Sequence, residues 1–365
     1  MKRILIIQES LNVGGAETLL TGILPYIDSS EYEINLLVLH KGGALDRLLP
    51  SNVKVKYFFG SHFKYYLWRV FVSVGVFLNY FSIKENEYDA ILSFLEGPSC
   101  VVHRSLLKGG KRNVTWVHTD FLKNHWSFKY FFNSRNEQRF YSKMNKIVFV
   151  SHAAKSNFKK VYNVDDSMLE VLTNAVDKNS ILEKSNLMSL HKERFTVCNV
   201  GRLDVAKRQE RIINIARYIL DKGYDFEFWI VGSGKEEEKL KSLIKKNCVE
   251  NNVFLKGYQP NPYPYIKCSD VFMLTSDYEG YPMVLCEALC LGKPIVSTKV
   301  TGAEEILSNG VGLLCDRDEK VLADALIELY ENGDRLSTMG SNALIASGKM
   351  SFETYVNRFI NILLK

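Results

Sequence analysis

The feature that most constrains the fold is a repeated alternation of short apolar runs with helix-length amphipathic stretches. Apolar runs typical of buried β-strands occur at residues 3–7, 33–39, 53–58, 90–94, 114–117, 146–150 and 171–172. After a polar stretch they resume at residues 195–200, 226–231, 253–255, 271–274, 295–297 and 312–314. Strands that alternate with crossover helices form parallel sheets, so we predict an α/β fold in which each half of the chain forms its own doubly wound sheet.

The domain organisation follows from chain length and from one polar segment. A chain of 365 residues exceeds one ordinary core, so two domains are expected. We predict a first domain over residues 1–176, a strandless linker over 177–194 and a second domain over 195–348. A C-terminal segment over 349–365 is predicted to be an amphipathic helix that crosses back to the first domain. The other predicted helices span residues 16–27, 209–222, 235–246, 283–291 and 320–331.

Composition excludes several classes of protein. A hydrophobic content of 46% without low-complexity tracts is typical of a globular chain. The seven cysteines include no CxxC pair and no Cys/His cluster at zinc spacing, which favours reduced thiols in a cytosolic protein. The N-terminus has no signal-peptide pattern and is predicted to be a strand. No RNP, KH, zinc-finger or helix-turn-helix signature is present, so nucleic acid is not an expected partner.

A basic, aromatic-rich segment lies in the first half of the chain. No acidic residue occurs between Asp46 and Glu85, although the whole chain has a net charge of only +6. Lys64, Trp68 and Arg69 are predicted to anchor the protein on an anionic membrane surface. The longest uncharged run, residues 70–83, is too short to span a bilayer. The alternative is that the aromatic residues fill the core and the lysines are merely solvated.

Two glycine-bearing turns follow predicted strands. In residues 11–17 the pair Gly14 and Gly15 lets the backbone approach a ligand, and the following helix N-terminus offers N–H groups to an anion. In residues 200–207 Gly201 is followed by Arg202, a planar fork for a phosphate, and by Lys207, a point charge. The alternatives are a plain turn in the first case and two solvated charges in the second. A Walker A loop is excluded because GxxxxGK[ST] does not occur.

Two carboxylates lie eight residues apart in the second half. Glu279 is in a Gly/Pro turn, whereas Glu287 is inside an apolar helix, where burial without a partner is costly. Ribose hydroxyls are suitable donors to Glu287, and hydroxyls of a transferred sugar could meet Glu279. The alternative for Glu287 is a hydrogen bond to a neighbouring turn. The segment between the two carboxylates is expected to face a diphosphate through Gly280, Tyr281, Pro282, Met283 and Val284.

These features, in this order, resemble the retaining glycosyltransferases of family 4, which have the GT-B fold. The matching motifs are GGAE near the N-terminus, GR-x4-K opening the second domain, E-x7-E with its apolar helix, and a glycine-rich loop at residues 300–306. The resemblance covers nearly the whole chain and is sharpest over residues 195–330. It implies two Rossmann-like domains that face each other across a cleft.

The resemblance also implies roles for individual residues. Arg202 and Lys207 would bind the donor diphosphate, Glu287 the ribose and Glu279 the donor sugar. Gly14 and Gly15 would shape the phosphate and acceptor region, and Gly201 and Tyr258 would complete the donor site. One departure is Arg208, because the family usually has glycine after the lysine.

His118 ends a predicted strand, and the resemblance implies that it lies near the donor sugar. Its alternative is a buried histidine whose hydrogen bonds are satisfied within the protein. Asp120 is either an acceptor contact or a helix N-cap.

No metal or cofactor is expected. Asp316 and Asp318 have the spacing of a metal-binding DxD motif, but they precede a predicted helix and are explained by capping and the helix dipole. The leaving diphosphate would then be neutralised by Arg202, Lys207 and backbone donors.

The resemblance therefore implies transfer, with retention of configuration, of a hexose or N-acetylhexosamine from a UDP-linked donor. The expected acceptor is a polyprenyl-diphosphate-linked oligosaccharide of bacterial surface-polysaccharide synthesis, at the cytoplasmic face of the cell membrane. Two alternatives stay open: a nucleotide-sugar epimerase of the same fold, and a non-catalytic protein that binds sugar nucleotides.

Overall fold

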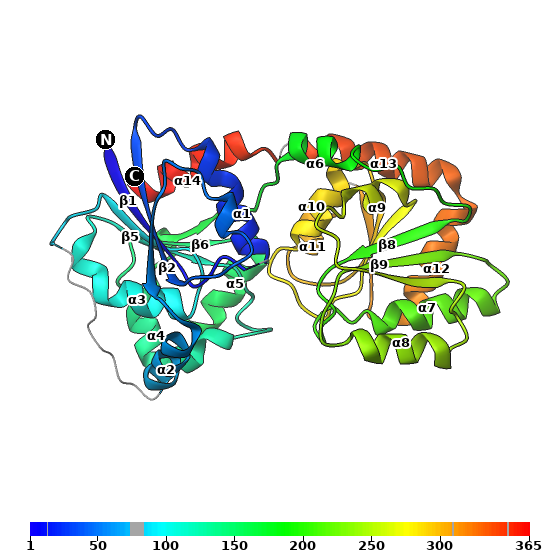
Figure 1. Ribbon diagram of the computed structural model, residues 1–365, viewed down its shortest axis with the longest axis horizontal. Helices are drawn as coiled ribbons and strands as arrows, with labels where there is room; N and C mark the ends of the chain where they lie inside the picture. Colours follow the sequence, from blue (N-terminus) through cyan, green and yellow to red (C-terminus); the bar gives the residue numbers. More distant parts are fainter. Residues whose placement is uncertain (13, 74–83, 309, 349) are drawn as a thin grey trace. The chain divides into compact units, whose positions relative to one another are not determined.

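The computed structural model describes residues 1–12, 14–73, 84–308, 310–348 and 350–365. The chain divides into two compact units (Figure 1). Unit 1 comprises Met1–Ala175 and Phe352–Lys365, and unit 2 comprises Val176–Ser351. Each unit is built on one wholly parallel sheet covered by helices, as predicted.

The sheet of unit 1 has seven strands in the order β3-β2-β1-β4-β5-β6-β7. The order reverses between β1 and β4, and in sheets of this kind ligands bind beyond the strand carboxyl ends at such a switch point. All five residues of β5 are buried, which explains why the strands read as apolar runs rather than as alternating patterns. The strand bounds are β1 (Lys2–Gln8), β2 (Tyr32–His40), β3 (Lys54–Phe59), β4 (Ala90–Ser93), β5 (Asn113–Val117), β6 (Lys146–Phe149) and β7 (Leu169–Val171).

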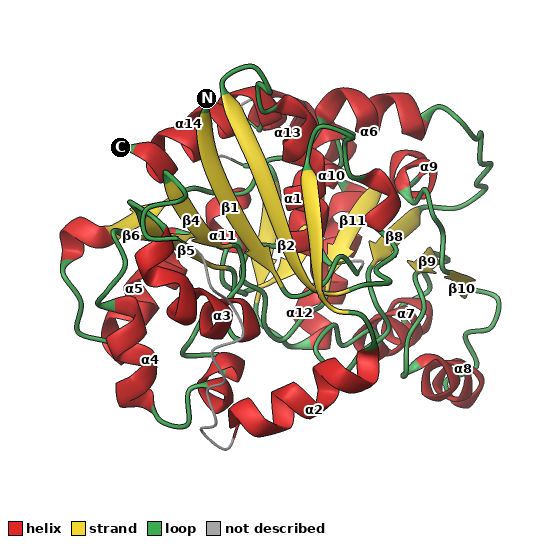
Figure 2. Cartoon of the chain, turned by 60° about the vertical axis from the view of Figure 1, so that its left-hand side comes forward, coloured by secondary structure: helices red, strands yellow, loops and turns green. Residues whose placement is uncertain are grey.

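The helices of unit 1 include one from the far end of the sequence. Phe359 of the C-terminal helix packs on Trp116, with ring centroids 5.2 Å apart, and Phe352 packs on Tyr26. This helix lies beside α1 (Figure 2). The helices are α1 (Gly15–Ile23), α2 (His62–Ser73), α3 (Pro98–Leu106), α4 (Ser134–Tyr141), α5 (His152–Val161) and α14 (Phe352–Leu364).

The sheet of unit 2 has six strands in the order β10-β9-β8-β11-β12-β13, with its switch point between β8 and β11. The strands are β8 (Thr196–Val200), β9 (Glu227–Val231), β10 (Val253–Gly257), β11 (Val271–Leu274), β12 (Ile295–Thr298) and β13 (Gly312–Cys315). The helices are α6 (Lys178–Ser185), α7 (Glu210–Asp221), α8 (Glu237–Lys246), α9 (Tyr263–Cys268), α10 (Met283–Cys290), α11 (Ala303–Ile306), α12 (Glu319–Glu331) and α13 (Gly333–Ser347).

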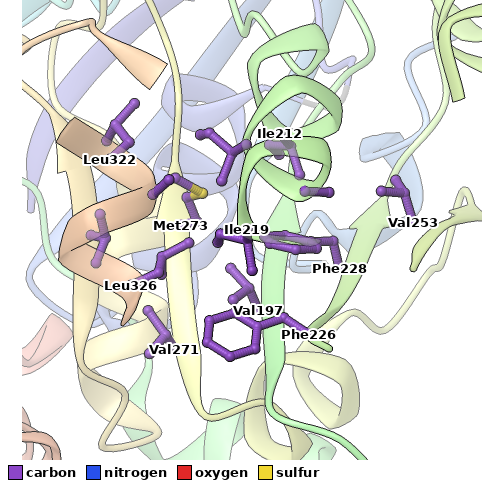
Figure 3. Packing of buried hydrophobic residues seen from close by; sticks show 14 of the residues in the cluster. Val197, Ile212, Ile219, Phe226, Phe228, Val253, Val271, Met273, Leu322 and Leu326 are labelled. Carbon is purple, nitrogen blue, oxygen red and sulfur yellow. The ribbon is translucent and has the colours of Figure 1, made fainter. Parts of the chain in front are cut away.

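Helical periodicity explains how the core of unit 2 is closed. Ile212 and Ile219 lie on one face of α7, and Leu322 and Leu326 lie on one face of α12. Both faces pack on the sheet around Met273 (Figure 3).

Two predicted segments differ in detail from the structure. The segment 177–194, predicted to be a strandless linker, contains no strand but includes α6: Asp177 caps this helix by accepting from the Ser180 N–H, and Ile181 is buried in the core of unit 2. The helix predicted over 16–27 ends as an α-helix at Ile23 and continues as the 3-10 turn Leu24–Tyr26. Pro25 is the cause, because it has no N–H to continue the α-helical pattern.

Candidate active site

The switch point of unit 2 brings together two of the segments singled out in the sequence. The Thr275 hydroxyl donates to the Lys207 carbonyl at 2.9 Å, and the Asp277 N–H donates to the Ala206 carbonyl at 2.9 Å. The turn after β8 and the turn after β11 are therefore hydrogen-bonded neighbours, although about 70 residues separate them in the chain.

The two charged side chains at this junction are paired. Lys207 Nζ lies 2.6 Å from Glu279 Oε1, and the Ser276 hydroxyl donates to the same oxygen at 2.6 Å. Both charged side chains are largely shielded from solvent, so each serves as counterion for the other in the ligand-free protein. The sequence analysis did not identify Ser276, because nothing in the sequence distinguishes it from other serines near strand ends. Its role depends on the turn that brings its hydroxyl to Glu279.

Arg202 differs from Lys207 in its surroundings. Its side chain is 74% exposed, and the one ion pair that it makes with a described residue, from Nε to Asp204 Oδ2, measures 3.7 Å. An exposed pair of this length contributes little, so the guanidinium can reorient toward an anion at little cost. Tyr258, just beyond β10 at the same edge of the sheet, is 57% exposed.

Glycines allow the loops at this edge to approach closely. A Cβ at Gly232 would lie 2.0 Å from the Gly201 carbonyl oxygen, and one at Gly302 would lie 2.6 Å from the Gly280 carbonyl oxygen. Both have positive φ values, 144° for Gly232 and 79° for Gly302. The loop around Gly302 therefore packs directly on the turn that opens α10.

Glu287 lies in the second turn of α10, among buried apolar residues of that helix. Burial raises the pKa of its carboxyl to about 7, an effect that the positive charge of Lys184 partly opposes. No hydrogen bond to its carboxylate occurs within the part of the chain that the structure describes. The alternative of a hydrogen bond to a neighbouring turn is therefore not realised among these residues.

Arg208 occupies the position at which the sequence departs from the expected glycine. Its φ is +54°, in the left-handed region that glycine adopts without strain. The side chain pairs with Glu210 at 2.8 Å and with Asp277 at 3.2 Å, and Asp277 also pairs with Arg211 at 2.7 Å. The guanidinium of Arg208 is thus paired with two carboxylates next to a backbone in a glycine-like conformation.

The acidic pair at residues 316 and 318 has structural roles. Asp318 caps α12 by accepting from the Lys320 N–H at 2.8 Å, and Asp316 pairs with Lys299 at 2.9 Å. Among the described residues, no group of three or more His, Cys, Asp and Glu side chains could hold a metal ion.

In unit 1, His118 lies just beyond β5 and is almost fully buried. Its Nε2 atom has no hydrogen-bond partner within the described residues, and burial lowers the pKa of the ring to about 3. His118 is therefore a neutral imidazole with one ring nitrogen uncommitted. Asp120 has a structural part, since it accepts from the Leu122 N–H at 3.0 Å and from Asn157 at 2.9 Å.

The carboxylate of Glu17 lies beside the turn at the start of α1. Gly14 precedes α1, and a Cβ there would lie 2.4 Å from Glu17 Oε2. The Gln8 side-chain amide donates to the other Glu17 oxygen at 3.4 Å. A phosphate near Gly14 and Gly15 would have to displace this carboxylate, a feature that the GGAE motif did not reveal.

The predicted membrane anchor is partly wrong. Trp68 is buried in the core of unit 1, and Arg69 donates to the Tyr130 hydroxyl and lies over the Tyr65 ring, 5.6 Å from its centroid. Only Lys64 of the three predicted anchor residues is exposed. The cause is helical periodicity: positions 65, 68 and 69 of α2 turn toward the core.

The outward face of α2 is nevertheless apolar. Phe63 is 70% exposed, Tyr66 64%, Leu67 40% and Val70 46%. Their spacing places all four on one face of the helix. The uncharged run 70–83 lies mostly outside the described residues. In the part of the chain that the structure describes, no helix is both long and apolar enough to cross a bilayer.

Comparison with known families accounts for both units. Residues 13–180 match the model described as "Glycosyltransferase Family 4", and residues 183–344 match "Glycosyl transferases group 1". An uncharacterized glycosyltransferase of Methanocaldococcus jannaschii is 34% identical over 185 residues, which is 50% of this chain and 44% of that protein. The chain thus matches less than half the length of this relative.

Another relative aligns over most of both chains. It is the N-acetylgalactosamine-N,N'-diacetylbacillosaminyl-diphospho-undecaprenol 4-alpha-N-acetylgalactosaminyltransferase of Campylobacter jejuni, 25% identical over 88% of this chain and 87% of that protein. Among solved structures, Anabaena HepE in complex with UDP has a TM-score of 0.78 at 22% identity, covering 100% of this chain and 99% of that chain. Its complex with UDP-glucose has a TM-score of 0.77 at 21% identity over the same shares.

Proposed function

Because the chain belongs to the family 4 glycosyltransferases, enzymes of the GT-B fold, we propose that it transfers a hexose or N-acetylhexosamine from a UDP-linked donor. The observation that carries the donor assignment is the half-buried Glu287 carboxylate, which has no hydrogen bond among the described residues. Ribose hydroxyls would supply the missing donors. The relative structure crystallised with UDP and with UDP-glucose supports this choice of nucleotide.

The other residues of unit 2 then divide the donor between them. Arg202 and Lys207 would bind the diphosphate, and Glu279 would accept hydrogen bonds from the sugar hydroxyls. The first backbone N–H groups of α10, after Pro282, would add donors and the positive end of the helix dipole. Together these groups would stabilise the charge that develops on the leaving diphosphate without a metal ion.

The proposed transfer retains the configuration at the anomeric carbon. The bond from that carbon to the diphosphate breaks while the acceptor hydroxyl attacks from the same face, and the diphosphate takes up the hydroxyl proton. In unit 1, the uncommitted Nε2 of His118 would accept a hydrogen bond from a sugar hydroxyl.

The proposed acceptor is an oligosaccharide on a polyprenyl diphosphate, reached at the cytoplasmic face of the membrane. The Campylobacter jejuni relative, whose name specifies an undecaprenol-linked diphosphate, supports an acceptor of this kind. The exposed apolar face of α2, beside Lys64, would dock on the anionic surface that carries such an acceptor.

Thermal shift with a set of nucleotide sugars tests the donor. UDP, UDP-glucose and UDP-N-acetylgalactosamine should stabilise the protein, by about 2.7 kcal/mol at 100 times Kd, and GDP-mannose should not. The Arg202→Ala, Lys207→Ala double variant should lose this response. Because Lys207 is the counterion of Glu279, the response is measured against the double variant's own ligand-free melting temperature. A wild-type protein that no UDP compound stabilises, or a double variant with wild-type turnover, would refute the proposed donor site.

A further inference from the structure

One carboxylate of unit 1 that the proposed mechanism does not use, that of Glu96, contacts His118 directly. Glu96, in the loop between β4 and α3, is completely buried. Its Oε2 accepts from the His118 backbone N–H at 2.9 Å, and its Oε1 accepts from the Trp126 indole N–H at 3.1 Å. The carboxylate therefore joins both ends of the segment 118–126.

The Glu96 carboxylate provides the His118 backbone N–H with an acceptor where the sheet no longer offers a carbonyl. The register of β5 with β6 ends at the pair Val117 and Phe149, so the next N–H, that of His118, lies beyond the ladder. A buried N–H without an acceptor is costly. Glu96 reaches across from the end of the neighbouring strand β4 and satisfies it.

The pattern of donors explains why this residue is a glutamate. Both partners donate a hydrogen, one to each oxygen, and an ionised carboxylate offers two acceptors and no donor. A glutamine amide would direct an NH₂ group at one of these donors and lose that bond. Burial raises the pKa of Glu96, whereas the hydrogen bonds it accepts act in the opposite direction.

The local backbone is built to bring these groups together. Gly97 has a φ of +85°, and a Cβ there would lie 2.7 Å from the Trp126 ring. A side chain at this position would push Trp126 away from Glu96. The turn at residues 96–97 thus allows the indole to pack against the backbone next to the carboxylate that it binds.

The His118 ring is held from its other side. It hydrogen-bonds to the backbone of Phe94 and packs on the Phe94 ring with centroids 5.0 Å apart, while its Nε2 has no partner among the described residues. A neutral ring that donates from Nδ1 to a carbonyl presents an Nε2 lone pair. His118 can therefore accept a hydrogen bond at Nε2, but it cannot donate one there.

We propose that Glu96 is a positioning residue: by holding the His118 backbone it fixes the ring with Nε2 as an acceptor for a sugar hydroxyl. Glu96 itself touches no substrate. The inference about the hydroxyl rests on the proposed function, whereas the positioning of the ring is a property of the ligand-free protein. The two can consequently be tested separately.

The first experiment needs no substrate. In the full-length protein labelled with ¹⁵N-histidine, the His118 ring signals are identified by their loss in His118→Ala. We expect the wild type to show the tautomer protonated at Nδ1 and Glu96→Gln to show a mixture of tautomers or exchange broadening. Unchanged His118 signals in a folded Glu96→Gln variant would overturn the proposal.

The second experiment measures turnover of UDP-glucose and UDP-N-acetylgalactosamine. Displacement of a reacting group by about 1 Å costs on the order of 100-fold, so Glu96→Gln should lower kcat by about 10- to 100-fold with little change in the donor KM. In the His118→Ala background the same change should have no further effect on kcat. Equal losses in both backgrounds would show that Glu96 does not act through His118.

A third variant covers the case in which Glu96→Gln does not fold. Glu96→Asp keeps both acceptor oxygens and the charge but retracts them by one methylene, so it should give the same changes with smaller amplitude. Wild-type signals and turnover in Glu96→Asp would count against the proposal. If the wild type turns over neither UDP-sugar, the proposed donor is wrong, and the tautomer measurement still decides the role of Glu96.

Discussion

Lys207 Nζ lies 2.6 Å from Glu279 Oε1, so the cation assigned to the donor diphosphate is paired with the carboxylate assigned to the donor sugar. The pair keeps both charges compensated in a partly shielded place when no ligand is bound. A donor that binds here has to attract Lys207 away from Glu279 or share it. Free UDP has no sugar that could bind Glu279. Its diphosphate would therefore compete with Glu279 for Lys207 without gaining a contact to Glu279 in return.

This relationship predicts opposite effects of one variant on two ligands. Glu279→Gln removes the competitor for Lys207 and the acceptor for sugar hydroxyls. It should leave UDP affinity unchanged or raise it, and should weaken UDP-glucose by about 10- to 100-fold, since a hydrogen bond to a charged group contributes about 1.5–3 kcal/mol. Isothermal titration calorimetry of both ligands measures the difference. Lys207→Ala is the matched control and should weaken both; equal weakening of both ligands by Glu279→Gln would refute this division.

Glu287 should affect stability and binding in opposite directions. Burial raises the pKa of its carboxyl to about 7 from an ordinary value of 4.5, so the folded state binds more protons between these values. Stability contributed by the protonated form is complete below about pH 4.5 and is lost as the pH rises through 7. Glu287→Gln, which cannot ionise, should therefore stabilise the ligand-free protein at pH 8 by about 1–3 kcal/mol. Urea unfolding at pH 5 and pH 8 measures this effect.

The same substitution should weaken nucleotide binding. Glu287→Gln removes a charged acceptor for ribose, so UDP should bind less tightly at pH 8, and wild-type affinity should fall as Glu287 is protonated below pH 7. Glu279→Gln serves as control, since no comparable gain in stability is expected there. A Glu287→Gln protein that is less stable at pH 8 and binds UDP normally would show that the residue is structural.

How far the sequence predicts this molecule depends on which physical property decides each feature. The strands were predictable because parallel strands buried on both faces are apolar runs. Arg202, Lys207, Glu279 and Glu287 were recognisable because charges at strand ends and inside an apolar helix need a ligand or a partner. That two of the four are partnered with each other was not visible, since the 2.6 Å contact depends on turns about 70 residues apart.

Other features were hidden for definite reasons. Both faces of α2 are rich in aromatic and aliphatic side chains, so periodicity did not tell which face turns inward, and Trp68 was assigned to the membrane although it is buried. Glu96 was missed because it accepts from a backbone N–H, and any residue other than proline at position 118 would provide that donor. The left-handed backbone at Arg208 was signalled only by the glycine expected there.

Activity should not require a divalent metal ion. Asp318 is engaged in capping α12 and Asp316 is paired with Lys299, so neither side chain is poised as a metal ligand. Transfer measured after dialysis against a chelator should stay within about twofold of the untreated enzyme, because Arg202 and Lys207 are proposed to neutralise the leaving diphosphate. Asp316→Asn should likewise be near neutral. Complete loss of transfer that Mg²⁺ or Mn²⁺ restores would contradict the metal-independent mechanism.

Arg208 should show the cost of a side chain in a glycine conformation. Its φ of +54° costs a non-glycine residue about 1–2 kcal/mol, which the contacts with Glu210 and Asp277 offset. Arg208→Ala keeps the strain and loses the ion pairs, whereas Arg208→Gly loses both. Arg208→Gly should therefore be more stable than Arg208→Ala by about 1 kcal/mol, the gain being reduced by the greater freedom of glycine in the unfolded chain. Urea unfolding of both variants decides this, and an alanine variant as stable as the glycine variant would show that the backbone relaxes.

The proposed membrane contact is on the outward face of α2, made of Phe63, Tyr66, Leu67 and Val70, with Lys64 beside it. Insertion of such side chains buries apolar surface, and a lysine near an anionic leaflet adds about 1 kcal/mol. Tyr66→Ser combined with Leu67→Ser should therefore weaken binding to anionic vesicles at least tenfold and leave the melting temperature nearly unchanged, because both side chains are exposed.

The matched control is Leu122→Ser, which should bind normally. Leu122 is an apolar residue of unit 1 that is 49% exposed and lies outside α2. Co-sedimentation at low and high salt measures both effects, since salt screens attraction between exposed charges. Binding that ignores lipid charge, or that survives the double substitution, would place the membrane contact elsewhere.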